Sequence, residues 1–229
     1  MKWLPKTDKR VIKLDPSRRQ KKFIKDIKTY METEGIMFEN HLTTMIGLRQ
    51  ISIDPTIIGL EHKSIPPKIQ FILDAIKDYP EKPIVIVSNF TRILKKLKEV
   101  LTDKRKDVGI IHGSVSKLQR QNIINDFQNK KLNIVLANIE TIKVGVKLSR
   151  AEEIIFLDQS LTHTDNEQTE DRIVATSEEE LANKEGQLVT VLLLKDSIDT
   201  YISNALKKKK SKTEIINDYK SHINKEEKV

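Results

Sequence analysis

Short apolar runs alternate with helical patterns through the middle of the chain and towards its end. Five runs are predominantly apolar, and they lie at PIVIV (83–87), DVGII (107–111), NIVLA (133–137), EIIFL (153–157) and LVTVLLL (188–194). Continuous apolar strands of this length are typical of a parallel sheet that is covered on both faces. Between them, Thr91 and Ser116 are predicted N-caps, and Leu94, Leu97 and Leu101 recur at helical spacing. The pattern predicts an α/β domain with a doubly wound parallel sheet, helices on both faces and right-handed crossovers.

The flanking segments have a mainly helical pattern. After a short strand at 10–14, a helix opens at Asp15, and a second helical stretch follows it. A further helix within 64–80 leads into the sheet, and an amphipathic helix after the last strand precedes the basic run at 207–212. We expect three parts: an N-terminal helical attachment and linker (1–63), the α/β domain with its C-terminal helix (64–212), and a tail that packs as a helix or frays (213–229).

Composition excludes several classes of protein. The 229 residues are 38% apolar and 32% charged, which is the balance of a globular protein with a sizeable core. The chain has no cysteine, which removes disulfides, thiolate metal sites and thiol nucleophiles and fits a reducing compartment. The longest apolar run, at 188–194, is too short to span a bilayer, and the first ten residues lack the apolar core of a signal peptide. We therefore expect a cytoplasmic protein without a membrane role.

The chain carries a formal charge of +8 and has a pI of about 9.4. A basic surplus favours an anionic partner, with nucleic acid as the first choice. The sequence is also rich in Lys, Ile and Asn throughout, so a general compositional bias explains the charge equally well. Charge alone leaves both interpretations open.

Polar loops follow the carboxyl ends of the predicted strands, which is where open parallel sheets bind their ligands. These loops are SNF (88–90), HGS (112–114), NIETIKVGVKLS (138–149) and DQSLTHTDNEQ (158–168). Taken singly, their residues have ordinary structural interpretations: Ser88 or Asn89 as a helix cap, Gly113 in a turn, and Gly145 at a positive φ angle.

Several familiar site motifs are absent from this sequence. A P-loop needs two glycines five positions apart followed by Lys and Ser or Thr, and no two glycines here have that spacing. The five histidines show no metal-ligand spacing, and no Gly-x-Ser-x-Gly motif is present. The sequence therefore predicts neither a metal site nor a nucleotide cradle of its own.

Taken together, in order and spacing, the loops resemble a specific family. PIVIVSNF, IHGSVSKLQRQNIINDFQ and ETIKVGVKLSRAEEIIFLDQSLTHTDNEQTEDR are similar to the C-terminal RecA-like lobe of the Swi/Snf-like DNA-dependent ATPases of helicase superfamily two. The resemblance continues outward through LRQISIDPTII (48–58), SIPPK (64–68) and DSIDTYISNALKKKK (196–210), the last of which matches the family's bracing helix. It implies a RecA-like fold for the α/β domain and half of a two-lobed motor.

In that family ATP binds between two RecA-like lobes, and the first lobe carries the P-loop and the acidic Mg²⁺ site. The present sequence resembles the second lobe. Gln168, Asp171 and Arg172 match the family's Gln-x-x-Asp-Arg motif, whose arginines reach the γ-phosphate when the lobes close. The resemblance also assigns Gly145 of motif V, with Gln168 and Arg172, to the nucleotide side. We expect ATP and Mg²⁺ to be held mainly by an N-terminal P-loop lobe, on the same parent chain or a separate one, and the isolated chain to be inactive.

The sequence departs from the family pattern at two places. The family usually has a second arginine three residues after the first; here Ala175 stands there, followed by TSEEE (176–180), where basic residues and glycine are usual. In motif V only Gly145 remains of Gly-Gly-Val-Gly, and Lys147 replaces the usual Asn. The chain is either a divergent motor that relies on Arg172 or a lobe whose ATPase role has decayed. On the first interpretation, an arginine placed at 175 would restore part of a second contact and raise the rate.

The resemblance also places several residues on the nucleic-acid side. The candidates for phosphate contacts are Ser88, Asn89, His112, Gly113 and Thr141. Such contacts position a duplex without reading its sequence. Lys143 and Lys147 either add charge there or are solvated loop lysines. Two functions stay open: the C-terminal motor lobe of an ATP-driven duplex DNA translocase without sequence preference, and a non-catalytic nucleic-acid-binding or regulatory module that kept the fold.

Overall fold

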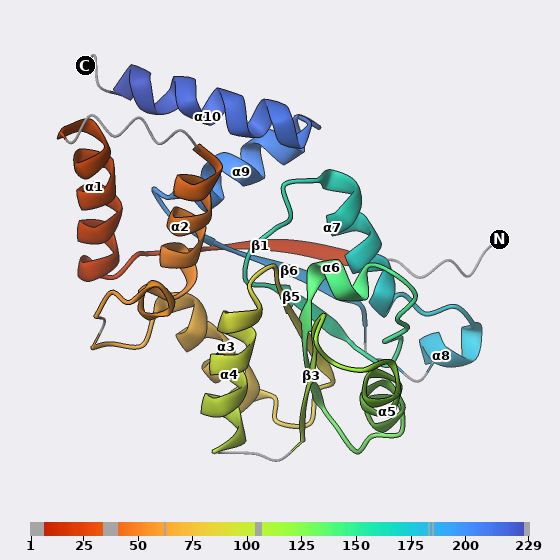
Figure 1. Ribbon diagram of the computed structural model, residues 1–229. Coiled ribbons are helices and arrows are strands. Elements are labelled where there is room, and N and C mark those ends of the chain that lie inside the picture. The colour runs from red at the N-terminus through yellow and green to blue at the C-terminus, as the bar shows by residue number, and fades with distance from the viewer. Residues whose placement is uncertain are drawn as a thin grey trace. The chain divides into compact units, whose positions relative to one another are not determined.

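The computed structural model describes residues 7–33, 41–61, 63–103, 107–182, 184 and 186–226, so parts of the predicted attachment and tail lie outside the described residues. Within this range the chain forms a six-stranded sheet with the order β1-β6-β5-β2-β4-β3 (Figure 1). The strands are β1 (Asp8–Leu14), β2 (Ile84–Ser88), β3 (Val108–Ile111), β4 (Ile134–Asn138), β5 (Glu153–Phe156) and β6 (Leu188–Leu194). All strands run parallel, which confirms the predicted α/β fold.

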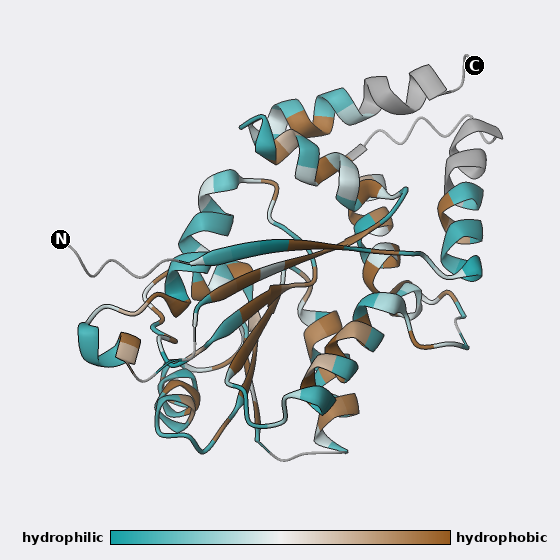
Figure 2. Ribbon diagram, turned by 180° about the vertical axis from the view of Figure 1, so that it is seen from behind, coloured by the Kyte–Doolittle hydropathy of each residue, from teal (hydrophilic) through white to brown (hydrophobic). Residues whose placement is uncertain are grey.

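The strand register brings the polar loops to one edge of the sheet. The central strand β2 pairs with β4 from Ile84 opposite Ile134 to Ser88 opposite Asn138, and with β5 on its other side. Every residue of β2 to β5 is buried, because helices cover both faces of these strands. Figure 2 shows the same strands as predominantly hydrophobic. Since parallel strands end at the same edge, the loops after β2, β4 and β5 become neighbours.

Helices and a 3₁₀ turn follow strands β2 to β5 in the sequence. They are α4 (Thr91–Thr102), α5 (Lys117–Gln128), α6 (Ile139–Ile142), α7 (His163–Glu170), α8 (Glu178–Ala182) and η2 (Asp171–Ile173). Ser116 is the N-cap of α5 as predicted, in a capping box in which its Oγ accepts from the N–H of Gln119 at 3.2 Å. The prediction for α4 was wrong by one residue, because Phe90 is its N-cap and Thr91 is its first residue.

Strand β1 lies at the edge of the sheet beside β6, whereas the sequence analysis had placed residues 10–14 with the attachment. Its side chains are largely exposed, so its hydrophobic pattern is weak. Polar contacts fix it instead: Arg10 Nη2 lies 2.9 Å from Glu153 Oε1, and Arg10 Nε donates to Thr190 Oγ1 at 2.8 Å. Lys82 Nζ donates to the other oxygen of the buried Glu153 at 2.7 Å. These contacts hold the pKa of Glu153 below its ordinary value even though its burial acts to raise it.

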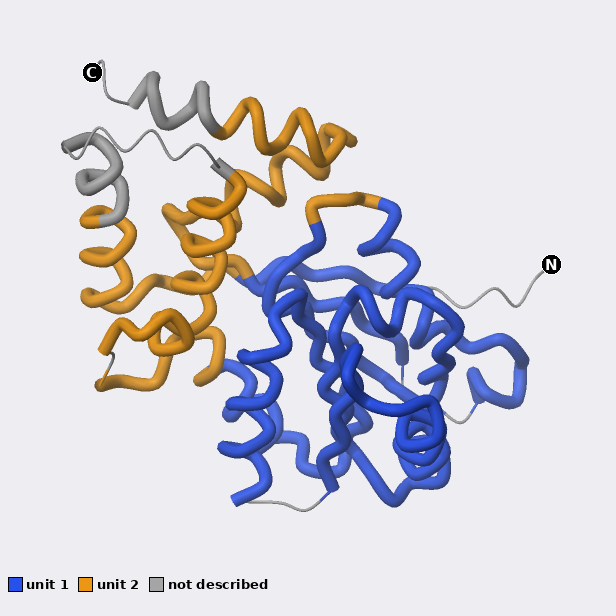
Figure 3. The backbone as a smooth tube through the Cα atoms, in the orientation of Figure 1, with its two compact units in different colours: residues 1–12, 71–160, 164–192 blue, residues 13–70, 161–163, 193–229 orange. Residues whose placement is uncertain are grey.

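The chain divides into two compact units (Figure 3). Unit 1 consists of residues 1–12, 71–160 and 164–192, and unit 2 consists of residues 13–70, 161–163 and 193–229. Unit 2 contains α1 (Arg18–Thr33), α2 (His41–Ile53), η1 (Pro55–Ile58), the start of α3 (Pro67–Asp78), α9 (Ile198–Lys207) and α10 (Lys212–Glu226). This division groups the predicted bracing helix α9 with the N-terminal helices, where the sequence analysis grouped it with the lobe.

Unit 2 has its own hydrophobic core, which joins helices from both ends of the sequence. Met45 and Ile51 from α2, Ile202 from α9 and Ile215 from α10 are buried in one cluster. Ile215 is fully buried and Tyr219 is 4% exposed, so the first half of the tail packs as a helix and does not fray. No helix among the described residues combines the length and the apolar character needed to cross a membrane.

A buried ion pair lies within unit 2. Lys68 Nζ is 2.7 Å from Asp199 Oδ2, and both side chains are almost completely buried. The same carboxylate oxygen accepts the N–H of Leu194 at 2.9 Å. Both charged groups lose their hydration on folding, and the ion pair compensates for part of that loss. It therefore holds the start of α3 against the start of α9.

Candidate functional site

Asp158 organises the loop that follows β2. Its carboxylate accepts hydrogen bonds from Ser88 Oγ at 2.5 Å, from the main-chain N–H of Asn89 at 3.1 Å and from Asn89 Nδ2 at 2.7 Å. Asn138, at the end of β4, donates from Nδ2 to Asn89 O at 2.9 Å. Strands β2, β4 and β5 therefore contribute to one polar network at their carboxyl ends.

This network changes the role of Ser88. Its side chain has no exposed surface, and its hydroxyl donates to Asp158 while accepting the N–H of Phe90 at 3.0 Å. The predicted phosphate contact from Ser88 is therefore not available in this structure, and the residue holds the loop in place. Asn89 is half-buried, and its amide nitrogen is already committed to Asp158. Sequence reasoning missed Asp158, although an acidic residue directly after a strand was a usable signal.

His112 and Gly113 form the turn after β3. His112 is only 8% exposed, and its Nδ1 accepts the N–H of Ser114 at 3.3 Å. Burial, together with the positive charges of Lys95 and Lys98, lowers the pKa of His112 below its ordinary value. The imidazole is therefore less protonated near pH 7 than an ordinary histidine and adds little positive charge to the loop. Gly113 beside it is exposed, so the backbone of the turn remains accessible.

The loop between α6 and β5 contains Thr141 and Gly145. Thr141 lies in α6 and is half-buried. Gly145 has a φ angle of +68°, in the left-handed region that favours glycine, as the sequence analysis expected. A Cβ added there would meet no atom within 4 Å, so the constraint comes from the backbone conformation and not from crowding.

Lys143 has carboxylate partners within the lobe. Its Nζ lies 2.7 Å from Glu140 Oε2 and 3.0 Å from Asp165 Oδ1. The hydrogen bond to Glu140 is the largest cause of the raised pKa of Lys143, and it outweighs the opposing effect of burial. Asp165 also accepts from Ser160 Oγ at 3.1 Å, so Lys143 connects α6 to the start of α7.

Lys147 is also paired. Its Nζ donates to Thr176 Oγ1 at 2.7 Å and forms an ion pair with Glu180, which lies in α8. Burial alone would raise the pKa of Glu180, but hydrogen bonds from Lys147 and Thr176 lower it to about 2. Neither Lys143 nor Lys147 is a solvated lysine without a partner. Much of the charge that they were expected to offer to DNA is compensated within the lobe.

Gln168, Asp171 and Arg172 lie where α7 passes into η2. Arg172 Nε donates to the main-chain oxygen of Gln168 at 2.9 Å, and the main-chain oxygen of Arg172 accepts the N–H of Leu148 at 2.8 Å. This second bond places the motif V loop beside the arginine. Among the described residues Arg172 has no carboxylate partner, and nearby Glu170 pairs with Lys9 instead. Gln168 and Asp171 are exposed.

Ala175 does not lie on the same helical face as Arg172. The helical geometry ends at Ile173, and Val174 is extended, with φ −68° and ψ 130°. Ala175 is only 3% exposed, and its N–H donates to Gln187 Oε1 at 2.9 Å. Lys184 approaches the same segment by donating to Ile173 O, and burial lowers the pKa of Lys184 to about 8. The position of the family's second arginine is thus occupied by a small buried side chain.

Comparison with known proteins agrees with this arrangement. Residues 67–175 match the model of the helicase conserved C-terminal domain. The chain is 31% identical over 135 residues to the ATP-dependent helicase FUN30 of Saccharomyces cerevisiae, covering 58% of this chain and 11% of that protein. It is 32% identical over 97 residues to the ATP-dependent helicase fft1 of Schizosaccharomyces pombe, covering 42% of this chain and 10% of that protein. The chain thus spans about a tenth of the length of these curated relatives.

Solved structures share the fold. The C-terminal part of the Fun30 ATPase domain superimposes with a TM-score of 0.74 at 18% identity, covering 91% of this chain and 90% of that one. The Sulfolobus solfataricus SWI2/SNF2 ATPase core in complex with double-stranded DNA gives a TM-score of 0.72 at 19% identity, covering 93% of this chain and 47% of that one. The chain therefore contains a helicase conserved C-terminal domain, is similar in sequence to the ATP-dependent helicases FUN30 and fft1, and shares its fold with the C-terminal part of the Fun30 ATPase domain and with the SWI2/SNF2 ATPase core.

Proposed function

We propose that this chain is the C-terminal motor lobe of an ATP-dependent duplex DNA translocase. In this role it supplies Arg172 to ATP that is held by a separate P-loop-bearing lobe, and its loops form part of the DNA track. Two findings support the proposal: the sequence relatives are ATP-dependent helicases, and a structural neighbour of the same fold is a complex with double-stranded DNA.

The availability of Arg172 is the observation that carries the proposal. One guanidinium nitrogen is held by the main-chain oxygen of Gln168, and the backbone is held by Leu148. The other two guanidinium nitrogens have no partner among the described residues. An arginine held in this way can meet an incoming phosphate without first breaking an internal ion pair, and its planar fork suits phosphate oxygens.

Phosphoryl transfer needs positive charge near the outer phosphate, and an arginine supplied by a closing partner accelerates it by roughly 10³–10⁵-fold in known NTPases. Arg172 would meet that need, with exposed Gln168 and Asp171 beside it at the closing surface. The described residues contain no cluster of three or more His, Asp or Glu that could hold a metal ion. Mg²⁺ and the inner phosphates would therefore be held mainly by the other lobe.

The purified chain alone is expected not to hydrolyse ATP, with or without duplex DNA. Arg172 provides charge but neither a phosphate cradle nor a metal site, so the chain has only one side of the cleft. The measurement is phosphate release from ATP at saturating DNA, with a complete two-lobed SWI2/SNF2 ATPase as the positive control. Robust DNA-stimulated turnover by the isolated chain would refute the proposal.

One observation favours the second candidate, a non-catalytic nucleic-acid-binding or regulatory module. Residues 164–192 contain eight Asp and Glu against two Lys and Arg. Asp165, Glu170 and Glu180 are paired with lysines outside this range, and the negative charge that remains opposes the approach of a nucleotide. An active first lobe combined with this chain distinguishes the candidates, because only a motor lobe would make hydrolysis depend on Arg172.

A further inference from the structure

The positive charge of the chain is unevenly divided between its two units. Unit 1, which contains the lobe, has 22 Lys and Arg against 20 Asp and Glu, a net charge of +2. Unit 2, which contains the helices of both flanks, has 19 against 13, a net charge of +6. Most of the basic surplus that points to an anionic partner therefore lies outside the lobe.

The loops of the lobe have little uncompensated positive charge. Lys143 is paired with Glu140 and Asp165, and Lys147 is paired with Glu180. Burial and the charges of neighbouring lysines lower the pKa of His112, so its imidazole adds little positive charge. These loops can offer N–H groups and hydroxyls to a phosphate, but they supply few of the cations that give salt-dependent affinity for DNA.

The segment from the end of α9 to the start of α10, in contrast, carries positive charge that is not compensated. Lys207, Lys208 and Lys209 are consecutive and exposed, and none of them has a carboxylate partner among the described residues. Two other lysines of unit 2, on either side of this turn in the sequence, have carboxylate partners: Lys195 pairs with Asp15, and Lys210 pairs with Asp218. The three side chains, which we call the lysine cluster, are therefore the uncompensated cations of this turn.

The backbone that carries the lysine cluster is fixed by its own hydrogen bonds. The N–H groups of Lys208 and Lys210 donate to Ala205 O at 3.1 and 3.2 Å, and that of Lys209 donates to Leu206 O at 2.8 Å. Lys209 has a φ angle of 55°, which turns the chain sharply at the end of α9. On the far side, Ser211 and Glu214 exchange hydrogen bonds that cap α10. The lysine side chains thus extend from an ordered turn.

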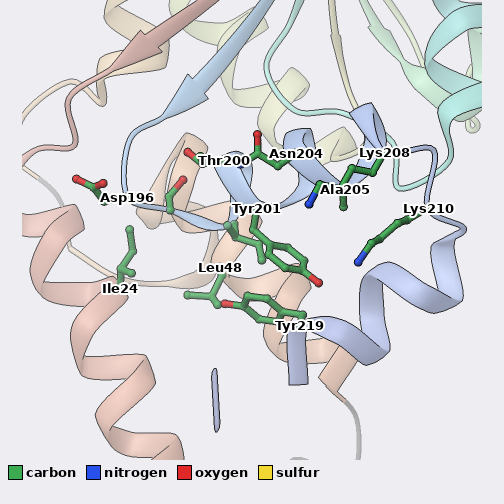
Figure 4. A pocket seen from close by; sticks show the side chains of 12 residues that line it. Ile24, Leu48, Asp196, Thr200, Tyr201, Asn204, Ala205, Lys208, Lys210 and Tyr219 are labelled. Atoms are coloured by element: carbon green, nitrogen blue, oxygen red, sulfur yellow. The ribbon is translucent and has the colours of Figure 1, made fainter. Parts of the chain in front are cut away.

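Space is available beside this turn. Lys208 and Lys210 line a cavity of about 470 Å³ within unit 2, together with Tyr201 and Asn204 (Figure 4). The Tyr201 hydroxyl is already committed to Ile215 O at 2.9 Å, so the aromatic side chain belongs to the framework of the cavity. A phosphate can approach Lys208 from this side without displacing a packed side chain.

We propose that Lys207, Lys208 and Lys209 form a contact surface for the phosphate backbone of duplex DNA, separate from the loops of the lobe. The inference rests on the proposed function for the identity of the partner. Three ammonium groups on one ordered turn neutralise neighbouring phosphates and release their counterions, and such contacts do not depend on base sequence. The cluster contributes three of the positive charges that give unit 2 its surplus.

The test measures the affinity of the whole chain for a labelled duplex by fluorescence anisotropy at a series of salt concentrations. The triple variant Lys207→Gln, Lys208→Gln, Lys209→Gln should reduce the magnitude of the slope of log K against log salt by about 2 to 3, because each lost lysine contact removes about 0.9. Affinity at low salt should fall by about tenfold or more. A triple Lys→Arg variant at the same positions keeps the charge and should bind like the parent chain.

The control carries the same change of charge in unit 1. Lys77, Lys130 and Lys131 are exposed, and their triple change to Gln should leave the slope nearly unaltered. Equal losses in both Gln variants would show a general effect of net charge and would overturn the inference, as would equal binding by the cluster variant and the parent chain. If the parent chain showed no salt-dependent binding, DNA as the partner in the proposed function would fail as well. Stronger binding to polyglutamate than to DNA would identify an acidic protein as the partner instead.

Discussion

Ala175 decides whether the lobe can provide a second arginine. The sequence suggested that arginine at this position would raise the rate, but Ala175 is 3% exposed and donates its N–H to the side chain of Gln187. Ala175→Arg should therefore lower the free energy of unfolding by about 1–3 kcal/mol through overpacking. It should not raise the ATPase rate of the complete two-lobed protein. Thermal unfolding compares it with Ala182→Arg, a change at an exposed alanine in α8. Similar stability of the two variants combined with faster hydrolysis by Ala175→Arg would show that position 175 can still reach the nucleotide.

Two single residues, Gly145 and Ser88, differ in how well the sequence predicted their surroundings. Gly145 was expected at a positive φ angle and is found there, because only one residue type tolerates that conformation well. Ser88 was expected to face a phosphate but is buried against Asp158. The sequence could not predict this contact, because it joins residues 70 positions apart through the pairing of β2 with β5.

Helix α8 is held to the motif V loop by the carboxylate of Glu180. Hydrogen bonds from Lys147 and Thr176 lower the pKa of Glu180 from its ordinary value of 4.5 to about 2. The ionised carboxylate therefore stabilises the folded lobe above about pH 4.5, and this contribution is lost as the pH falls towards 2. Glu180→Gln should melt at a lower temperature than the parent chain at pH 7, and the difference should shrink over that acidic range. Glu178→Gln is the control, because Glu178 is exposed on the same helix and has no partner among the described residues. A difference that is independent of pH would exclude this account of α8.

The elements of the sheet were predictable for a physical reason. The central strands are buried on both faces, so each appears in the sequence as a continuous apolar run. Strand β1 lacked this signal because it is largely exposed and is fixed by Arg10. The association of α9 with α2 could not be predicted either, since about 150 residues separate them and only their shared core in unit 2 brings them together.

In the whole molecule, the two units are expected to have different roles. In the proposed function the lobe supplies Arg172 and the loops that contact DNA, while unit 2 carries most of the net positive charge. We propose that Arg172 acts on ATP held by another lobe and that it acts without a second arginine. If so, removing the Arg172 side chain must slow ATP hydrolysis without changing folding or DNA binding.

The most direct test is the steady-state ATPase rate of the complete two-lobed protein at saturating duplex DNA, compared between the parent and Arg172→Ala. We expect the rate of Arg172→Ala to be lower by roughly 10²-fold or more. Melting temperature and DNA affinity should stay nearly unchanged, because Arg172 has no ion pair among the described residues to lose. Asp171→Asn, which alters the exposed neighbour without removing the guanidinium, should retain more activity than Arg172→Ala. Rates of the parent and Arg172→Ala within about twofold of each other, measured on equally folded proteins, would contradict the claim that this arginine serves the reaction.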